Sequence, residues 1–193
     1  KYCQSKGWSQ IAIMCDSGGY GKGGKASLQS EAAAFGITII ASEDFDPKGT
    51  DFTAQLTNIK NTGAQAFVCW TTSQGAAIVA SNRAALNMTM PLICSHGVAN
   101  TTFIDNAGAA ANGVVFPAGK LLVADQLEDT DPQKDVLLTY KEDFEEAYPG
   151  ETADTFGGHA YDALNMVVEA LDEVGADKEK MRDFIESEIT NWA

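Results

Sequence analysis

The sequence is poor in basic residues and in histidine. It contains 13 lysines and arginines against 27 aspartates and glutamates, which gives a formal net charge of −14 at pH 7. A surface of that charge repels phosphate backbones and anionic membranes, so nucleic acid is not an expected partner. Only two histidines occur, and neither a G-x-S-x-G nor a C-x-x-C motif is present. We therefore expect a protein that is not an enzyme and that uses no metal and no cofactor.

Long apolar runs are also missing. No stretch approaches the ~20 apolar residues that a membrane helix requires. The opening "KYCQSKGW" has no hydrophobic signal-peptide core. Both ends look like interrupted elements, because a helix end runs into a strand at the start and "ESEITNWA" has neither a cap nor a terminal strand. We expect a fragment of a longer protein, which leaves a lost secretion signal open.

Four cysteines are present, without the spacing of a disulfide framework. Cys15, Cys69 and Cys94 each stand near the end of an apolar run, and Cys3 stands in the leading helix. Three thiols at similar depth on parallel strands would suit a metal, but no histidine spacing accompanies them. Free cysteine packs as a small hydrophobe, so core packing is the favoured interpretation.

What the sequence does contain is a regular alternation of apolar runs and amphipathic stretches. The pattern predicts helices between successive strands, over residues 22–35, 51–61, 75–86 and 100–110. It predicts strands over residues 11–15, 37–42, 66–71, 91–95 and 113–117. These strands are apolar nearly throughout, as in a parallel sheet that helices cover on both faces. The expected fold class is α/β, an open, doubly wound parallel sheet with strand order 2-1-3-4-5.

The rhythm changes after Gly119. A polar, acidic loop follows, and three successive helices are then predicted over residues 133–147, 153–174 and 177–188, with no strand between them. We expect residues 1–118 to form the α/β domain. Residues 119–193 are expected to form a crossing segment and the helices of a second, incomplete domain.

The stretch "CDSGGYGKGGKAS", residues 15–27, fits two phosphate-binding patterns. Gly19, Gly21 and Gly24 make a G-x-G-x-x-G motif, and the same stretch nearly makes a Walker A loop. The Walker A interpretation fails at Ala26, where the hydroxyl that binds magnesium should stand. The glycines are therefore at most a dinucleotide-binding motif.

The dinucleotide interpretation stays open at this point. Glu43 and Asp44 follow the next strand at a suitable distance, but the glycines begin several residues after the first strand. Whatever they bind, the glycines predict a tight turn from a strand into a helix. Tyr20 stands in the middle of that turn, at the sheet edge where open α/β sheets bind ligands.

The order of these segments resembles a known family. The second lobe of the type I periplasmic binding proteins is similar to the series "WSQIAIMCD", "GGYGKG", "FGITII", "DFTAQLTNIKNTGAQAFV", "MPLICSHGVAN" and "NGVVFPAG". The resemblance is to the branched-chain amino-acid (leucine/isoleucine/valine) receptor family of ABC transporters. The later stretch "DPQKDVLLTYKEDFEEAYPGETADTFGGHAYDALNMVVEAL" resembles the segment in which those receptors return to their first lobe.

The resemblance implies a receptor that traps a small solute between two lobes and delivers it to an ABC permease in the membrane. It implies a periplasmic or extracellular location, either free or lipid-anchored. Two other interpretations stay open: a cytoplasmic dinucleotide-binding enzyme domain, which the glycines suggest, and the ligand-sensing domain of a signalling receptor, which uses the same fold.

The resemblance also implies ligand contacts, at Tyr20, within Thr71, Thr72 and Ser73, at His96, and at Phe156. At the position of His96, amino-acid receptors of the family carry a glutamate that holds the ammonium group of the ligand. A carboxylate neutralises a buried ammonium, whereas an imidazole only hydrogen-bonds it or, when protonated, repels it. The expected solute is a small amino acid, amide or carboxylate, with an ordinary α-amino acid in doubt. We expect His96 to lie within reach of Tyr20 and of the Thr71–Ser73 loop.

Overall fold

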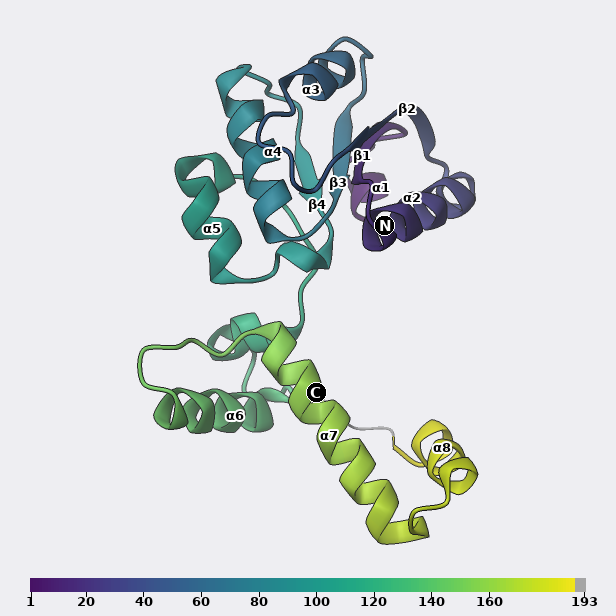
Figure 1. Cartoon of the computed structure of the whole chain (residues 1–193), viewed down its shortest axis with the longest axis vertical. Helices are drawn as coiled ribbons and strands as arrows, with labels where there is room; N and C mark the ends of the chain where they lie inside the picture. Colours follow the sequence, from purple (N-terminus) through teal and green to yellow (C-terminus); the bar gives the residue numbers. More distant parts are fainter. Residues whose placement is uncertain (190–193) are drawn as a thin grey trace. The chain divides into compact units, whose positions relative to one another are not determined.

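The computed structural model describes residues 1–189, apart from the side chain of Ser73. The chain divides into two compact units, Lys1–Pro117 and Ala118–Ala193, each of which is described by itself (Figure 1). Within the described residues, no helix combines the length and the apolar character that crossing a membrane demands.

The first unit is built on a four-stranded parallel sheet. Its strands are β1 (Gln10–Asp16), β2 (Thr38–Phe45), β3 (Ala66–Trp70) and β4 (Leu92–Cys94). Their order is β2-β1-β3-β4, so the predicted α/β class and the predicted order of the first four strands are confirmed. Beyond Gln10, β1 is buried along its whole length, because it has a neighbouring strand on each side and helices on both faces.

The predicted fifth strand, over residues 113–117, is reduced to a single bridge between Val115 and Ile93. Val115 donates one backbone hydrogen bond to β4 and accepts one from it. The segment is bounded by Gly113, whose φ is +76°, and by Pro117, which has no N–H to donate. Extended pairing therefore has room for only one residue.

Helices cover both faces of this sheet (Figure 1). One face is covered by α1 (Tyr2–Ser5) and α2 (Gly19–Glu31). The other is covered by α3 (Thr53–Lys60), α4 (Ser73–Ala85) and α5 (Thr101–Ala107). Three short 3-10 helices complete the unit, at Ala32–Phe35, His96–Val98 and Gly108–Ala111.

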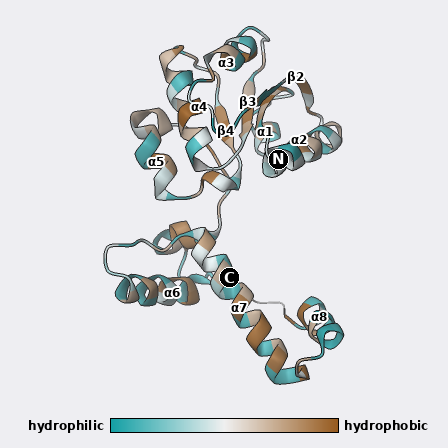
Figure 2. Ribbon diagram, viewed as in Figure 1, coloured by the Kyte–Doolittle hydropathy of each residue, from teal (hydrophilic) through white to brown (hydrophobic). Residues whose placement is uncertain are grey.

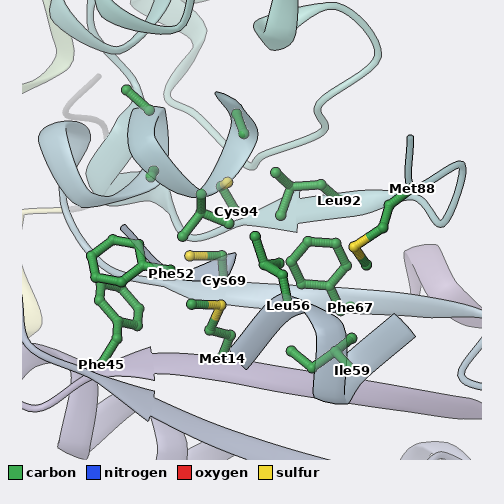
Figure 3. Packing of buried hydrophobic residues seen from close by; sticks show 14 of the residues in the cluster. Met14, Phe45, Phe52, Leu56, Ile59, Phe67, Cys69, Met88, Leu92 and Cys94 are labelled. Carbon is green, nitrogen blue, oxygen red and sulfur yellow. The ribbon is translucent and has the colours of Figure 1, made fainter. Parts of the chain in front are cut away.

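The larger core lies on the face that α3, α4 and α5 cover. Figure 3 shows Leu56 and Ile59 of α3 beside Phe67 of β3, and all three side chains are fully buried. The rings of Phe45 and Phe52 pack against each other with their centroids 4.5 Å apart. Aromatic and aliphatic side chains of this size supply most of the apolar area that a small core buries.

All four cysteines are buried and free, which agrees with the interpretation that they pack in the core. Burial raises the pKa of the Cys15 thiol to about 11. A hydrogen bond with Cys94, together with burial, holds the pKa of the Cys69 thiol well above its ordinary value. Among residues 1–189, no three histidine, cysteine or acidic side chains gather in a way that would hold a metal ion.

In its described part, the second unit consists of helices and loops. The helices are α6 (Lys134–Ala147), α7 (Thr155–Val174) and α8 (Lys178–Ser187). They follow a 3-10 helix, Lys120–Gln126, which is kinked at Val123 and lies where the sequence predicted a loop. This 3-10 helix forms because Leu121 and Ala124 are buried in a small apolar cluster with Leu137 of α6. Figure 2 shows the apolar stretches of α7, whose exposed side chains include Tyr161, Leu164, Val167, Val168 and Leu171.

Candidate functional site

Three loops of the first unit start from one edge of the sheet. The strands β1, β3 and β4 are parallel neighbours, and the register pairs Cys15 with Trp70 and Cys69 with Cys94. The carboxyl ends of these strands are therefore nearly level, and the residues that follow them meet at the edge where open α/β sheets bind ligands. The candidates Tyr20, Thr71–Ser73 and His96 each follow one of these strand ends.

The glycine-rich stretch forms the first turns of α2, so the helix begins three residues before the predicted start at residue 22, and the predicted turn is shorter than the Gly19–Gly24 stretch. The helix begins at Gly19, three residues after the last residue of β1, Asp16. A Cβ atom on Gly21 would lie 2.0 Å from the carbonyl oxygen of Asp16. Only glycine lets the helix pass so close to the end of the strand.

Gly24 likewise allows α2 to lie close to a side chain of β3. A Cβ atom on Gly24 would lie 2.3 Å from the indole of Trp70, whereas nothing lies within 4 Å of such an atom on Gly23. The spacing of Gly21 and Gly24 thus follows from the packing of α2 against β1 and β3. Packing therefore accounts for these two glycines without a bound dinucleotide.

Tyr20 and His96 meet at the sheet edge, as expected. The Tyr20 hydroxyl lies 3.5 Å from Nδ1 of His96, and the two ring centroids are 5.8 Å apart at an interplanar angle of 87°. Both side chains are exposed. A Cβ atom on Gly97 would lie 3.2 Å from the Tyr20 hydroxyl, so the glycine after His96 leaves room for the tyrosine.

Trp70, the last residue of β3, is the third ring of this group and was missed by the sequence analysis. Its ring centroid lies 5.8 Å from that of Tyr20 and 6.4 Å from that of His96. We call Tyr20, Trp70 and His96 the aromatic wall. The run "AFVCW" suggested an ordinary buried strand, and the available signal was a large aromatic residue at the last position before a predicted contact loop.

The indole of Trp70 carries an unsatisfied polar atom. Its Nε1 is buried and has no hydrogen-bond partner among the described residues. Leaving a buried donor without a partner costs about 1–3 kcal/mol. The tryptophan is therefore not the residue that stability alone would favour at the end of β3.

The Thr71–Ser73 loop presents less side chain than predicted. Thr71 is 1% exposed, and its carbonyl oxygen accepts a hydrogen bond of 2.8 Å from the Ser95 hydroxyl. This bond ties the loop after β3 to the loop after β4. Thr72 is exposed at the start of α4, and the Ser73 side chain lies outside the described residues. A ligand contact at these three residues stays a prediction.

Phe156 belongs to the second unit, near the start of α7. Its ring is 48% exposed. The helix begins there because the Asp154 carboxylate accepts a hydrogen bond of 2.8 Å from the Gly157 N–H. The contact of Phe156 with a ligand also stays a prediction.

The aromatic wall has no acidic partner. In the part of the chain that the structure describes, no carboxylate forms a hydrogen bond or an ion pair with the three rings. The carboxylate of Asp16, at the end of β1, is buried and accepts a hydrogen bond of 2.8 Å from the Gly18 N–H, at the start of α2. The wall can stack and hydrogen-bond, but it offers no charge to neutralise a cation.

Comparison with known proteins gives one consistent result. The chain is 22% identical, over 167 residues, to the Leu/Ile/Val-binding protein homolog 3 of Brucella melitensis. The aligned region covers 86% of this chain and 42% of the relative. An extracellular ligand-binding receptor from Rhodopseudomonas palustris HaA2 superposes with a TM-score of 0.83 at 22% identity, over 96% of this chain and 54% of that one.

A second solved structure shares the fold. The branched-chain amino acid transporter substrate binding protein LivJ from Streptococcus pneumoniae, in complex with isoleucine, has a TM-score of 0.74 at 21% identity, over 95% of this chain and 50% of that one. The chain spans about half the length of these relatives. A family model described as "Periplasmic binding protein" matches residues 1–188. As the resemblance implied, the chain belongs to the periplasmic binding protein family, with the fold of its type I members.

Proposed function

We propose that the protein that contains this chain is an extracytoplasmic solute-binding receptor of an ABC importer, and that it is not an enzyme. The observation that carries the proposal is the contact between Tyr20 and His96 at the carboxyl edge of the sheet. Two exposed rings from separate loops meet where open α/β sheets bind ligands, in a chain of the periplasmic binding protein family. The partners are a small solute and a membrane permease, and the location is periplasmic or extracellular.

The solute is a small amino acid, amide or carboxylate. His96 and Tyr20 bring an imidazole and a phenol to the site, and both groups hydrogen-bond neutral or anionic oxygen atoms. The Thr72 hydroxyl, exposed at the start of α4, adds a further polar group. Phe156 of the second unit contributes an aromatic ring to recognition of the same solute. Residues 1–118 and 119–193 correspond to a complete lobe and to part of another.

The experiment is calorimetric titration of the protein at its natural length, after a thermal-shift screen with amino acids, amides, carboxylates, NAD and ATP. A ligand that prefers the native state raises stability by RT ln(1 + [L]/Kd). Replacing His96 with alanine should weaken solute binding by about 1–3 kcal/mol, because a buried polar group of the solute loses its partner. The unliganded melting temperature should change little, since His96 is exposed.

His159→Ala is the matched control, because the other histidine is also exposed and lies on α7 in the second unit. It should leave affinity unchanged. His96→Glu should weaken the binding of an anionic solute, because the new carboxylate repels it. The same variant should strengthen the binding of an amino acid, because the carboxylate pairs with its ammonium group. Unchanged affinity with a large fall in the melting temperature of His96→Ala would make His96 a structural residue. Specific binding of NAD or ATP would contradict the receptor proposal.

A further inference from the structure

Trp70 carries two local penalties at the aromatic wall. Its indole N–H is buried without a hydrogen-bond partner among the described residues, and α2 needs a glycine at position 24 to accommodate the ring. A phenylalanine at the end of β3 would leave no polar atom unsatisfied. A local departure from the most stable choice is expected where a residue serves function.

The indole contacts the two rings that are exposed. The His96 ring is nearly perpendicular to both of its neighbours, at 87° to Tyr20 and 88° to Trp70, and the Tyr20 ring is tilted by 41° to the indole. Edge-to-face and tilted contacts are the favoured arrangements of aromatic pairs. Because the indole is the only one of the three rings that is partly buried, it is the support against which the exposed rings of Tyr20 and His96 pack.

The charges near the wall also restrict the solute. Asp16 is buried and accepts a hydrogen bond from the Gly18 N–H, and Asp44 forms an ion pair with Lys25 at 2.8 Å. Among the described residues, no carboxylate bonds to the three rings, so the wall itself offers a desolvated cation no anionic partner. An aromatic ring would instead find ring edges and faces, and a carboxylate would find the donors of a phenol and an imidazole.

We propose that Trp70 is a positioning residue that sets the specificity of the solute site, and that the aromatic wall selects an aryl carboxylate without an ammonium group. This inference rests on the proposed receptor function and adds its substrate class. Trp70 acts through Tyr20 and His96, so its replacement changes the ranking of solutes as well as their affinity.

The test is calorimetric titration of the natural-length protein with three matched probes. The first is 3-phenylpropionate, the second is 3-cyclohexylpropionate, which lacks the aromatic face, and the third is L-phenylalanine, which adds an ammonium group. The wild-type protein should bind 3-phenylpropionate tightest. Removing the aromatic face should weaken binding by about 2- to 10-fold, the range of an aromatic pair. The ammonium group should weaken it by roughly 10-fold or more, since it has no anionic partner at the wall.

Three variants separate a positioning role from a structural one. Trp70→Leu should bring the ratio between 3-phenylpropionate and 3-cyclohexylpropionate close to one, whereas Trp70→Phe should keep most of that ratio. Trp8→Phe is the control, because Trp8 packs against Tyr2 with ring centroids 5.9 Å apart and, within residues 1–189, forms no ring contact with the aromatic wall. It should leave the ranking unchanged.

The failures are distinguishable. If the wild-type protein prefers L-phenylalanine or isoleucine to 3-phenylpropionate, the inference is wrong and the receptor function stands. If Trp70→Leu weakens all probes by one factor, Trp70 is only structural and the inference is again wrong. If Trp70→Leu does not fold, the ranking of the three probes by the wild-type protein and by Trp70→Phe still tests the inference. If the wild-type protein binds no probe and no amino acid, amide or carboxylate, the receptor function fails and the inference fails with it.

Discussion

The two units of this chain differ most in charge and in what their helices cover. Residues 1–117 carry seven acidic and seven basic side chains, so the whole formal charge of −14 falls on residues 118–193, which carry twenty acidic and six basic ones. In the first unit, helices bury both faces of a sheet. In the second unit, α7 leaves large apolar side chains exposed, and Leu164 is 64% accessible. Burial holds the first unit together, whereas the second has a small core and a strongly acidic surface.

The largest expected effect on stability is that of adding a Cβ atom at Gly21, where α2 passes the end of β1. Gly21→Ala should destabilise that unit by about 4 kcal/mol or more, because the new Cβ atom would collide with the backbone of Asp16 and not with a movable side chain. Gly23→Ala is the matched control in the same helix, with nothing within 4 Å of the new atom. It should stabilise the unit by about 0.5–1 kcal/mol, as alanine does in a helix interior. Urea unfolding followed by hydrogen exchange of the β1 amides measures both, and equal effects would show that α2 does not lie so close to β1.

Paired leucine truncations compare the two units directly. Leu56→Ala should cost about 2–5 kcal/mol, because Leu56 of α3 is fully buried and its removal leaves a cavity. Leu164→Ala on α7 should change the free energy of unfolding by about 0.5 kcal/mol or less, since the side chain is already exposed. Urea titrations of both variants give the two values. A large cost at Leu164 would mean that the apolar side of α7 is covered in solution, and the contrast between the units would then disappear.

The same contrast explains which elements the sequence predicted. In the first unit, apolar runs such as "IAIMCD" and "AFVCW" lie on buried strands, so composition and burial agree along β1 and β3. The prediction of a fifth strand was wrong in extent because pairing at Val115 is limited by the backbone of Gly113 and by Pro117. The hydrophobicity of the segment gives no sign of either limit. In the second unit, the segment after Gly119 was taken for a loop because the apolar contacts that make it helical come from α6.

The candidate site was predictable in part. Topology alone brings the residues after β1 and β4 to one edge, which is why Tyr20 and His96 meet as predicted. Trp70 was missed because a strand-end aromatic residue has the same pattern as a core residue. The glycines left a dinucleotide interpretation open because a phosphate loop and a close helix crossing both require residues without a Cβ atom. The contacts of Gly21 and Gly24 give both residues a role in packing α2 against the sheet.

A smaller difference between the units comes from the thiols, all of which belong to the first unit. Burial raises the pKa of Cys15 from 9.0 to about 11 in the folded chain. Below the pKa of the thiol in the unfolded chain, both states keep its proton. As the pH rises toward the pKa of the thiol in the folded chain, only the unfolded state loses the proton. The stability of the first unit should therefore fall between about pH 9 and pH 11. Cys15→Ala should show a flatter decline, measured by hydrogen exchange of β1 at several pH values. An equal decline in the variant would assign the effect to other groups.

The smallest expected effect is the response of the second unit to salt. Its net charge opposes folding, and its ion pairs, which include Lys120–Asp131 and Lys134–Asp129, lie partly in solvent. Such pairs contribute about 0–1 kcal/mol each, and salt weakens them as it weakens the repulsion. Because acidic side chains outnumber basic ones by more than three to one in residues 118–193, the relief of repulsion should prevail. Raising sodium chloride from 0.05 to 0.5 M should stabilise α6 by about 1 kcal/mol or less, measured by hydrogen exchange of its amides.

The neutral first unit supplies the internal control for the salt response. Its seven acidic and seven basic side chains produce no net repulsion, so exchange from β1 should change much less over the same range of salt. The exposed pair Glu142 and Glu146 stands four residues apart on α6, where like charges destabilise a helix by about 0.2–0.5 kcal/mol. Replacing both with glutamine should stabilise α6 at low salt and reduce its salt dependence. An equal gain in β1 and α6 would show that salt acts through general solvation, and the charge difference between the two units would then have no consequence for stability.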